Sequence, residues 1–202
     1  MGHELVHVAD DDPAMRDSLA FLLETAGFAV RLYESGTALL ERLATLVSGC
    51  VLTDIRMPGL DGLDLLRHLR ETGNTLPVVV MTGHGDVPLA VEAMKRGACD
   101  FIEKPFDDEV LLRALRHALS PGRTSTAADP IVQDFLRRVE TLSERERQVL
   151  DRLVAGATSK EIGRALDISP RTVEIYRAKL MTKTQATSLQ DLVRRAVLAG
   201  LA

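Results

Sequence analysis

Four charged residues with chemistry suited to phosphoryl transfer stand at or just after the ends of short apolar runs in this sequence. Asp10 and Asp11 follow the first run, Asp54 ends a second, and Lys104 follows a third. Clustered carboxylates repel one another, and Mg²⁺ relieves that repulsion while taking oxygen ligands. A carboxylate oxygen can attack phosphorus, and a lysine can pair with phosphate oxygens. If the apolar runs are strands of one parallel sheet, these side chains meet at its carboxyl edge.

Two further residues extend this predicted site. Thr82 ends a fourth apolar run and offers a hydroxyl to phosphate oxygens, while Lys104 precedes Pro105. A cis peptide bond at that proline would aim the lysine inward. An isolated acidic triplet such as residues 10–12 is more often a solvated loop, but Asp54 and Lys104 at successive strand ends favour a metal and phosphoryl site.

The elements that would position these residues alternate along the first 120 residues. Apolar runs predict strands, and amphipathic stretches with capping residues predict helices between them. The predicted strands cover residues 4–9, 28–33, 50–53, 77–81 and 99–103, and the predicted helices cover residues 13–26, 36–45, 63–71, 87–96 and 107–119. Five such units predict an α/β domain with a five-stranded, doubly wound parallel sheet.

The rest of the chain predicts a linker and a second, all-α domain. Residues 121–140 begin with a polar stretch rich in proline and glycine, and residues 131–140 can extend a helix toward the second domain. Ser143 and Glu146 form a capping box for the first of four helices. Ser159 and Ser169 open the next two, residues 160–166 and 171–183, and residues 189–198 form the fourth. A short helix followed closely by a longer one is the helix-turn-helix arrangement. The predicted domains are therefore 1–120 and 141–202.

Composition limits the class of protein. The chain has 202 residues, and no run of 18 apolar residues predicts a membrane span. No secretory signal is visible, and Cys50 and Cys99 lie in apolar runs, which predicts reduced thiols and a cytoplasmic protein. Residues 1–122 carry 19 acidic and 11 basic residues, whereas residues 123–202 carry 10 and 14. A basic second part is compatible with binding to nucleic acid.

The helix over residues 171–183 has one face suited to DNA. At the α-helical period, Val173, Tyr176 and Leu180 form a buried stripe, and the opposite face carries Arg171, Ile175, Ala178 and Thr182. An outward isoleucine suits a thymine methyl group, and Glu174 can accept from a cytosine amino group. Lys160, Lys179, Lys183, Ser159 and Ser169 are candidates for phosphate contacts. An ordinary solvated face is the alternative for any one of these residues. The full predicted DNA-binding set is Lys160, Arg171, Thr172, Glu174, Ile175, Tyr176, Ala178, Lys179 and Lys183.

Residues 3–120 resemble the receiver domain of bacterial two-component response regulators. The resemblance rests on the acid cluster and on TDIRMPGLDG (53–62), MTGHGD (81–86) and FIEKPF (101–106). It implies that Asp54 accepts the phosphoryl group. It also implies that Asp11, Asp54 and the Arg56 carbonyl ligate Mg²⁺ directly, with Asp10 acting through water. Thr82 and Phe101 are the implied switch pair, with phenylalanine where many receivers have tyrosine.

Residues 141–202 resemble the LuxR-type DNA-binding domain through LSERERQVL (142–150) and ISPRTVE (168–174). The chain departs from common members at Tyr176, often histidine, and after Lys183, where an apolar residue is common. Both halves together resemble the FixJ branch of the NarL/FixJ regulators, particularly through GHGDVPLAVEAM (83–94). That branch implies three partners: a sensor histidine kinase similar to the haem-containing FixL, promoter DNA and RNA polymerase. It also implies transcriptional activation, including that of nitrogen-fixation or oxygen-responsive genes.

Three functions compete on these grounds. The first is a transcription factor that forms a homodimer on phosphorylation, through a receiver surface around residues 90–95 and 101–104. The second is a phosphatase acting through an aspartyl phosphate, which needs an acid two residues after the nucleophile, where this chain has Arg56. The third is an adaptor without DNA binding, against which the capped, basic C-terminal helices argue. We expect the first, with no enzymatic turnover of external substrates.

Overall fold

The computed structural model describes residues 4–42, 46, 48–83, 87–120 and 130–201. These residues fall into two compact units, one formed by Met1–Gly85 with Arg96–Gly122 and the other by Asp86–Lys95 with Arg123–Ala202. Within the described ranges, no helix is long and apolar enough to cross a bilayer. Neither Cys50, which is buried, nor Cys99, which is half-buried, forms a disulfide.

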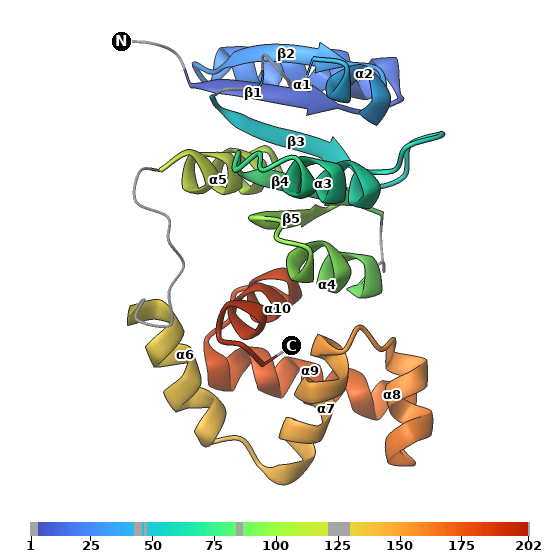
Figure 1. The fold of residues 1–202 in the computed structure, drawn as a ribbon. Helices are drawn as coiled ribbons and strands as arrows, with labels where there is room; N and C mark the ends of the chain where they lie inside the picture. Colours follow the sequence, from blue (N-terminus) through green and yellow to red (C-terminus); the bar gives the residue numbers. More distant parts are fainter. Residues whose placement is uncertain (1–3, 43–45, 47, 84–86, 121–129, 202) are drawn as a thin grey trace. The chain divides into compact units, whose positions relative to one another are not determined.

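The first unit is built on a five-stranded sheet in the order β2-β1-β3-β4-β5 (Figure 1). All four strand pairs are parallel, which confirms the predicted doubly wound α/β fold. The strands are β1 (Leu5–Ala9), β2 (Ala29–Tyr33), β3 (Cys50–Asp54), β4 (Val78–Thr82) and β5 (Asp100–Glu103). The central strands β3 and β4 are buried along their whole length, as expected for apolar strands covered by helices on both faces.

The helices of this unit are α1 (Pro13–Thr25), α2 (Gly36–Leu40), α3 (Gly62–Glu71) and α5 (Asp108–Leu119). Asp12 caps α1 through the Ala14 N–H, and Pro13 occupies the first turn, where its missing N–H costs no hydrogen bond. The prediction of a helix over residues 36–45 was too long, because α2 ends at Leu40 and Glu41 and Arg42 form a turn. Residues 43–45 lie outside the described part of the chain.

Side chains from both faces of the first unit's sheet are buried. One cluster joins inward residues of β1, β3, β4 and β5 to α1 and α5, and includes Val8, Leu23, Leu52, Met81 and Leu115. Each of these five side chains has no solvent-exposed area. Close packing of this kind fixes the strands, and therefore the places where their carboxyl ends emerge.

The second unit contains α4 (Val87–Lys95), α6 (Pro130–Glu140), α7 (Glu144–Val154), α8 (Ser159–Leu166), α9 (Pro170–Thr184) and α10 (Leu189–Leu198). The helical core includes Phe135 and Val139 from α6, together with Leu150, Val173 and Leu192. The α6 residues fall within the predicted linker 121–140, yet they pack into the same core as the four predicted helices. Helix formation over residues 131–140 was among the sequence expectations, and the structure confirms it.

Two local features shape the α8–α9 pair. Thr158, rather than Ser159, caps α8, and it forms a capping box with Glu161, so the prediction of Ser159 as the cap was wrong by one residue. Gly163 in α8 faces the turn before α9, where an added Cβ would lie 2.7 Å from the Ile168 carbonyl oxygen. A glycine at that place allows the close approach of α8 to the turn that precedes α9.

Candidate phosphoryl site and nucleic-acid interface

Three carboxylates meet at the carboxyl edge of the sheet. Asp10 follows β1 and Asp54 ends β3, and these two strands are neighbours. One carboxylate oxygen from each of Asp10, Asp11 and Asp54 lies within 4.8 Å of the others. Strand order and register therefore produce the cluster that the sequence predicted.

Lys104, which directly follows β5, reaches the same cluster. Its Nζ donates to Asp10 Oδ2 at 3.0 Å and lies 3.2 Å from Asp54 Oδ1. Its backbone N–H also donates to the Thr82 carbonyl oxygen at 2.7 Å, which anchors the residue to the end of β4. The bond between Lys104 and Pro105 is cis, as expected from the sequence.

The backbone around the acids is held in place by the local sequence. Asp10 is 1% exposed, and its Oδ1 accepts from the Asp12 N–H at 2.9 Å. The Arg16 guanidinium donates to the Asp10 carbonyl oxygen at 2.8 Å. A Cβ at Gly62 would collide with the Asp54 carbonyl oxygen, so a glycine is needed for α3 to begin this close to β3.

The electrostatics of the site favour a cation. Burial raises the pKa of the Asp54 carboxyl group, Lys104 lowers it, and the charges of Asp10 and Asp11 raise it further. Burial alone would lower the pKa of the Lys104 ammonium group, but its bonds to Asp10 and Asp54 raise it overall. Lys104 thus pairs with two of the three carboxylates, and the remaining negative charge suits a divalent ion.

The donor set fits Mg²⁺ by its chemistry. All three groups supply carboxylate oxygens, the hard ligands that this ion prefers. Arg56 lies two residues beyond Asp54 in the following loop, with an exposed side chain. The Arg56 carbonyl oxygen remains a predicted ligand of Mg²⁺.

The predicted switch pair is buried beside the site. Thr82, at the end of β4, is 2% exposed, and Phe101 in β5 is 6% exposed. Phe101 pairs in register with Val80, two residues before Thr82 on the neighbouring strand. The pair therefore occupies adjacent strands, with Thr82 at the edge where the acids gather.

Helix α9 has the two faces that the sequence predicted. Val173 and Leu180 are fully buried and Tyr176 is half-buried, whereas Arg171, Ala178 and Thr182 are exposed. Ile175 is 51% exposed. Ser169 caps the helix through the Thr172 N–H at 3.0 Å, and the hydroxyl groups of these two residues lie 2.8 Å apart.

The lysines predicted to contact phosphates differ in their surroundings. Lys160 is exposed, and Lys179 Nζ lies 5.5 Å from the centre of the Tyr176 ring. Lys183, in contrast, donates to Glu146 Oε2 at 2.6 Å. Glu146 is only 4% exposed, and the bond from Lys183 is the main reason why the pKa of its carboxyl group is lowered. Lys183 therefore ties α9 to α7, a role that the sequence analysis missed.

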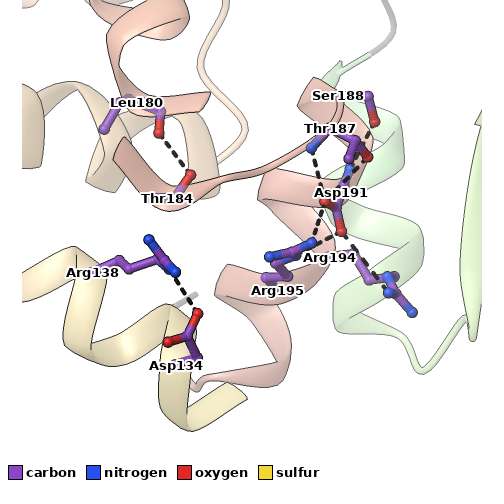
Figure 2. A network of polar contacts seen from close by, with 9 residues as sticks. All are labelled: Asp134, Arg138, Leu180, Thr184, Thr187, Ser188, Asp191, Arg194 and Arg195. Atoms are coloured by element: carbon purple, nitrogen blue, oxygen red, sulfur yellow. Dashed lines mark hydrogen bonds and ion pairs between the residues drawn. The ribbon is translucent and has the colours of Figure 1, made fainter. Parts of the chain in front are cut away.

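The end of α9 and the start of α10 are fixed by short-range polar contacts (Figure 2). The Thr184 hydroxyl donates to the Leu180 carbonyl oxygen at 2.6 Å. Asp191 accepts from the Thr187 N–H at 3.0 Å and from Arg195 Nε at 2.7 Å, and its own N–H donates to the Ser188 hydroxyl. The Thr184 hydroxyl and the Asp191 carboxylate are thus engaged within the fold.

Arg177 and Ser159 also contact Glu174, and Arg177 is not among the residues predicted from the sequence to bind DNA. The spacing of Glu174 and Arg177, three residues apart on one helix, was a signal for an ion pair. Ser159 lies on a different helix, so no local pattern connected it to Glu174.

Comparison with known proteins extends these observations. The model of the response regulator receiver domain family matches residues 6–116, and that of the LuxR family of bacterial regulatory proteins matches residues 140–196. The transcriptional regulatory protein FixJ of Bradyrhizobium diazoefficiens is 52% identical over 99% of this chain and 97% of its own length. FixJ of Rhizobium meliloti is 49% identical over 96% of each chain. A crystal structure of full-length FixJ from B. japonicum covers all of both chains at 51% identity, with a TM-score of 0.58.

Proposed function

Because this chain belongs to the response regulator receiver family and carries a LuxR-type DNA-binding domain, we propose that phosphorylation of Asp54 controls its binding to promoter DNA. The chain is a FixJ-like transcriptional regulator and not an enzyme. The observation that carries the proposal is the meeting of Asp10, Asp11, Asp54 and Lys104 at one sheet edge.

The proposed reaction is transfer of a phosphoryl group from a sensor histidine kinase. An oxygen of the Asp54 carboxylate attacks the phosphorus of a phosphohistidine, the phosphorus–nitrogen bond breaks, and the imidazole nitrogen keeps the electron pair. Lys104 and the Thr82 hydroxyl stabilise the phosphoryl oxygens. Asp11, Asp54 and the Arg56 carbonyl would hold Mg²⁺ directly, with Asp10 acting through water, and the ion would neutralise the charge that gathers there.

The proposed output is dimerisation. A phosphoryl group adds negative charge and three acceptor oxygens, which draw the Thr82 hydroxyl toward Asp54. Phe101 then turns into the space that Thr82 leaves, and the changed receiver surface pairs with a second copy. Two α9 helices would reach half-sites about one helical turn apart. On α9, Arg171, Thr172, Glu174, Ile175, Tyr176, Ala178 and Lys179 are the proposed contacts, with Lys160 on α8 and Lys183 at the α9 end.

The proposal extends to the regulon and the partners. The relatives named FixJ are transcriptional regulatory proteins, which favours activation of nitrogen-fixation or oxygen-responsive genes. The partners proposed with it are a FixL-like sensor kinase and RNA polymerase. A phosphatase is the weaker reading, because Arg56 stands where such an enzyme needs a general acid.

The test is DNA binding by the full chain with and without acetyl phosphate and Mg²⁺. We expect fluorescence anisotropy on a duplex selected from a random library to show tighter binding by the phosphorylated wild type. The Asp54→Asn variant should bind at the unphosphorylated level under both conditions. Equal affinities for all four samples would contradict control through Asp54.

A further inference from the structure

Ser159, Glu174 and Arg177 form a closed triangle of polar contacts between α8 and α9. The Ser159 hydroxyl donates to Glu174 Oε1 at 2.6 Å, and Arg177 Nη1 donates to the same oxygen at 2.7 Å. Arg177 Nη1 also donates to the Ser159 hydroxyl oxygen at 3.1 Å. Two side chains, one from each helix, therefore hold one oxygen of the Glu174 carboxylate.

The triangle has an inner and an outer side. The Arg177 side chain is 21% exposed, whereas the Glu174 side chain is 55% exposed, beside the exposed Ile175. Both hydrogen bonds that the described residues make with this carboxylate end on Oε1. Its other oxygen, Oε2, is left to accept from a donor outside the protein.

Two physical effects make this arrangement suitable for reading a base. A free carboxylate on a DNA-binding face is repelled by the phosphates, and the Arg177 charge offsets that repulsion at short range. An unrestrained glutamate loses rotamer freedom when it binds, and fixing it beforehand lowers that cost. The hydrogen bond from Ser159 also fixes the Glu174 carboxylate to α8, a different helix from the one that carries it.

We propose that Ser159 and Arg177 are positioning residues that hold the Glu174 carboxylate ready to accept from the exocyclic amino group of a cytosine in the major groove. This inference rests on the proposed function, because it takes α9 as the recognition helix. Cytosine is the base whose major-groove edge presents only a donor, and a carboxylate can only accept.

The experiment is selection of sites from a random duplex library by the full-length protein with acetyl phosphate and Mg²⁺. Glu174→Ala identifies the position at which cytosine preference depends on this side chain. Anisotropy on duplexes that differ only there should show a preference of about tenfold for the wild type. Glu174→Ala should lose the preference, and Ser159→Ala should reduce it to about threefold or less, because the carboxylate is no longer fixed.

Two further variants separate positioning from a merely structural role. Ser159→Thr keeps a hydroxyl and should restore the cytosine preference. Ser169→Ala removes the hydroxyl that caps α9, so it should weaken binding to all sequences alike and leave the preference intact. Thermal unfolding of each variant establishes that it is folded.

Three results would count against the inference. An unchanged cytosine preference in Ser159→Ala, or an equal loss for every sequence, overturns the positioning role. If the selected site contains no position at which cytosine preference depends on Glu174, the proposed contact with cytosine is wrong. A wild-type protein that selects no sequence overturns the proposed function itself, so the two failures are distinct.

Discussion

The two functional regions of this molecule obtain their geometry in opposite ways. The phosphoryl site gathers Asp10, Asp54 and Lys104 from distant parts of the sequence, and the backbone of a buried sheet places them. The proposed DNA-binding face gathers neighbours on the exposed side of α9, and contacts with other helices decide which of these side chains are available. At the sheet edge the strand topology determines which residues meet, whereas on α9 the partners of each side chain determine which residues can contact a ligand.

This difference determines what each charge can do. The charges at the sheet edge have one another as partners, and their imbalance invites a cation. On α9, Lys183 is occupied by the buried Glu146, whereas Arg171 stands exposed. A helical wheel therefore does not show that Lys183 already has a partner within the protein.

The largest expected effect is loss of phosphorylation in Asp54→Asn. An amide oxygen is a poor nucleophile, so no phosphoprotein should appear in the intact mass after treatment with acetyl phosphate and Mg²⁺. Asp12→Asn is the matched control, because Asp12 caps α1 and an asparagine caps equally well. A mass increase in Asp54→Asn like that of the wild type would place the phosphoryl group elsewhere.

The next effect concerns α6, which supplies Phe135 to the core of the second unit. Phe135 has no exposed area, so Phe135→Ala should lower the free energy of unfolding of that unit by about 3–5 kcal/mol. Urea unfolding followed by circular dichroism measures this loss. Arg137→Ala, on the exposed side of α6, should change it by less than about 0.5 kcal/mol. Similar values for both would mean that α6 is only a linker.

Magnesium should stabilise the first unit through the acid cluster. At about one hundred times its dissociation constant, the ion should add about 2.7 kcal/mol to the free energy of unfolding of the wild type. Asp11→Asn removes one ligand and should lose most of that gain, as measured by thermal unfolding with and without Mg²⁺. An equal gain in both proteins would show that the ion binds without Asp11.

A smaller effect is expected from the ion pair between Lys183 and Glu146. Lys183→Met leaves a buried carboxylate without its main partner, and should cost about 1–1.5 kcal/mol, since Lys183 is partly screened by solvent. Denaturant unfolding gives the value. DNA affinity at a temperature where the variant is fully folded shows whether Lys183 also contacts phosphate. If Lys183→Met has normal stability but binds DNA weakly and with little dependence on salt, Lys183 contacts phosphate rather than stabilising the contact between α9 and α7.

The smallest effect is a pH dependence from His7 in β1. Burial lowers the pKa of this imidazole, which is hydrogen-bonded to the Tyr33 hydroxyl and the Ser48 carbonyl oxygen. Its folded-state pKa is below the unfolded value of about 6.5, so the unfolded state binds the proton more readily. The free energy of unfolding should therefore fall as the pH drops below about 6.5. A difference of one bound proton changes this free energy by roughly 1.4 kcal/mol per pH unit, and we expect His7 to contribute a fraction of that slope.

His7→Gln, which does not titrate, should remove that part of the dependence. The free energy of unfolding of both proteins is measured at pH 7.5 and 5.5. The difference between their pH dependences is the contribution of His7, because the two proteins share all other titratable groups. Parallel pH profiles would mean that His7 is not the group that titrates.

The gathering of charged residues at the sheet edge could be predicted from the sequence more fully than the contacts around α9, for a physical reason. Parallel strands must end at one edge, so residues after apolar runs could be brought together without knowing any side-chain contact. The Thr158 cap and the contact between Ser159 and Glu174 depend on the exact start of α8 and on how it lies against α9. Neither follows from periodicity. The short α2 was overestimated because the amphipathic pattern continues past the turn at Glu41.

Phosphorylation-dependent dimerisation can be measured by sedimentation velocity of the wild type and Asp54→Asn, each with and without acetyl phosphate and Mg²⁺. We expect a shift from monomer to dimer in the wild type with phosphodonor and in no other sample. A shift in Asp54→Asn as well, or none in a wild type whose mass shows full phosphorylation, would contradict it.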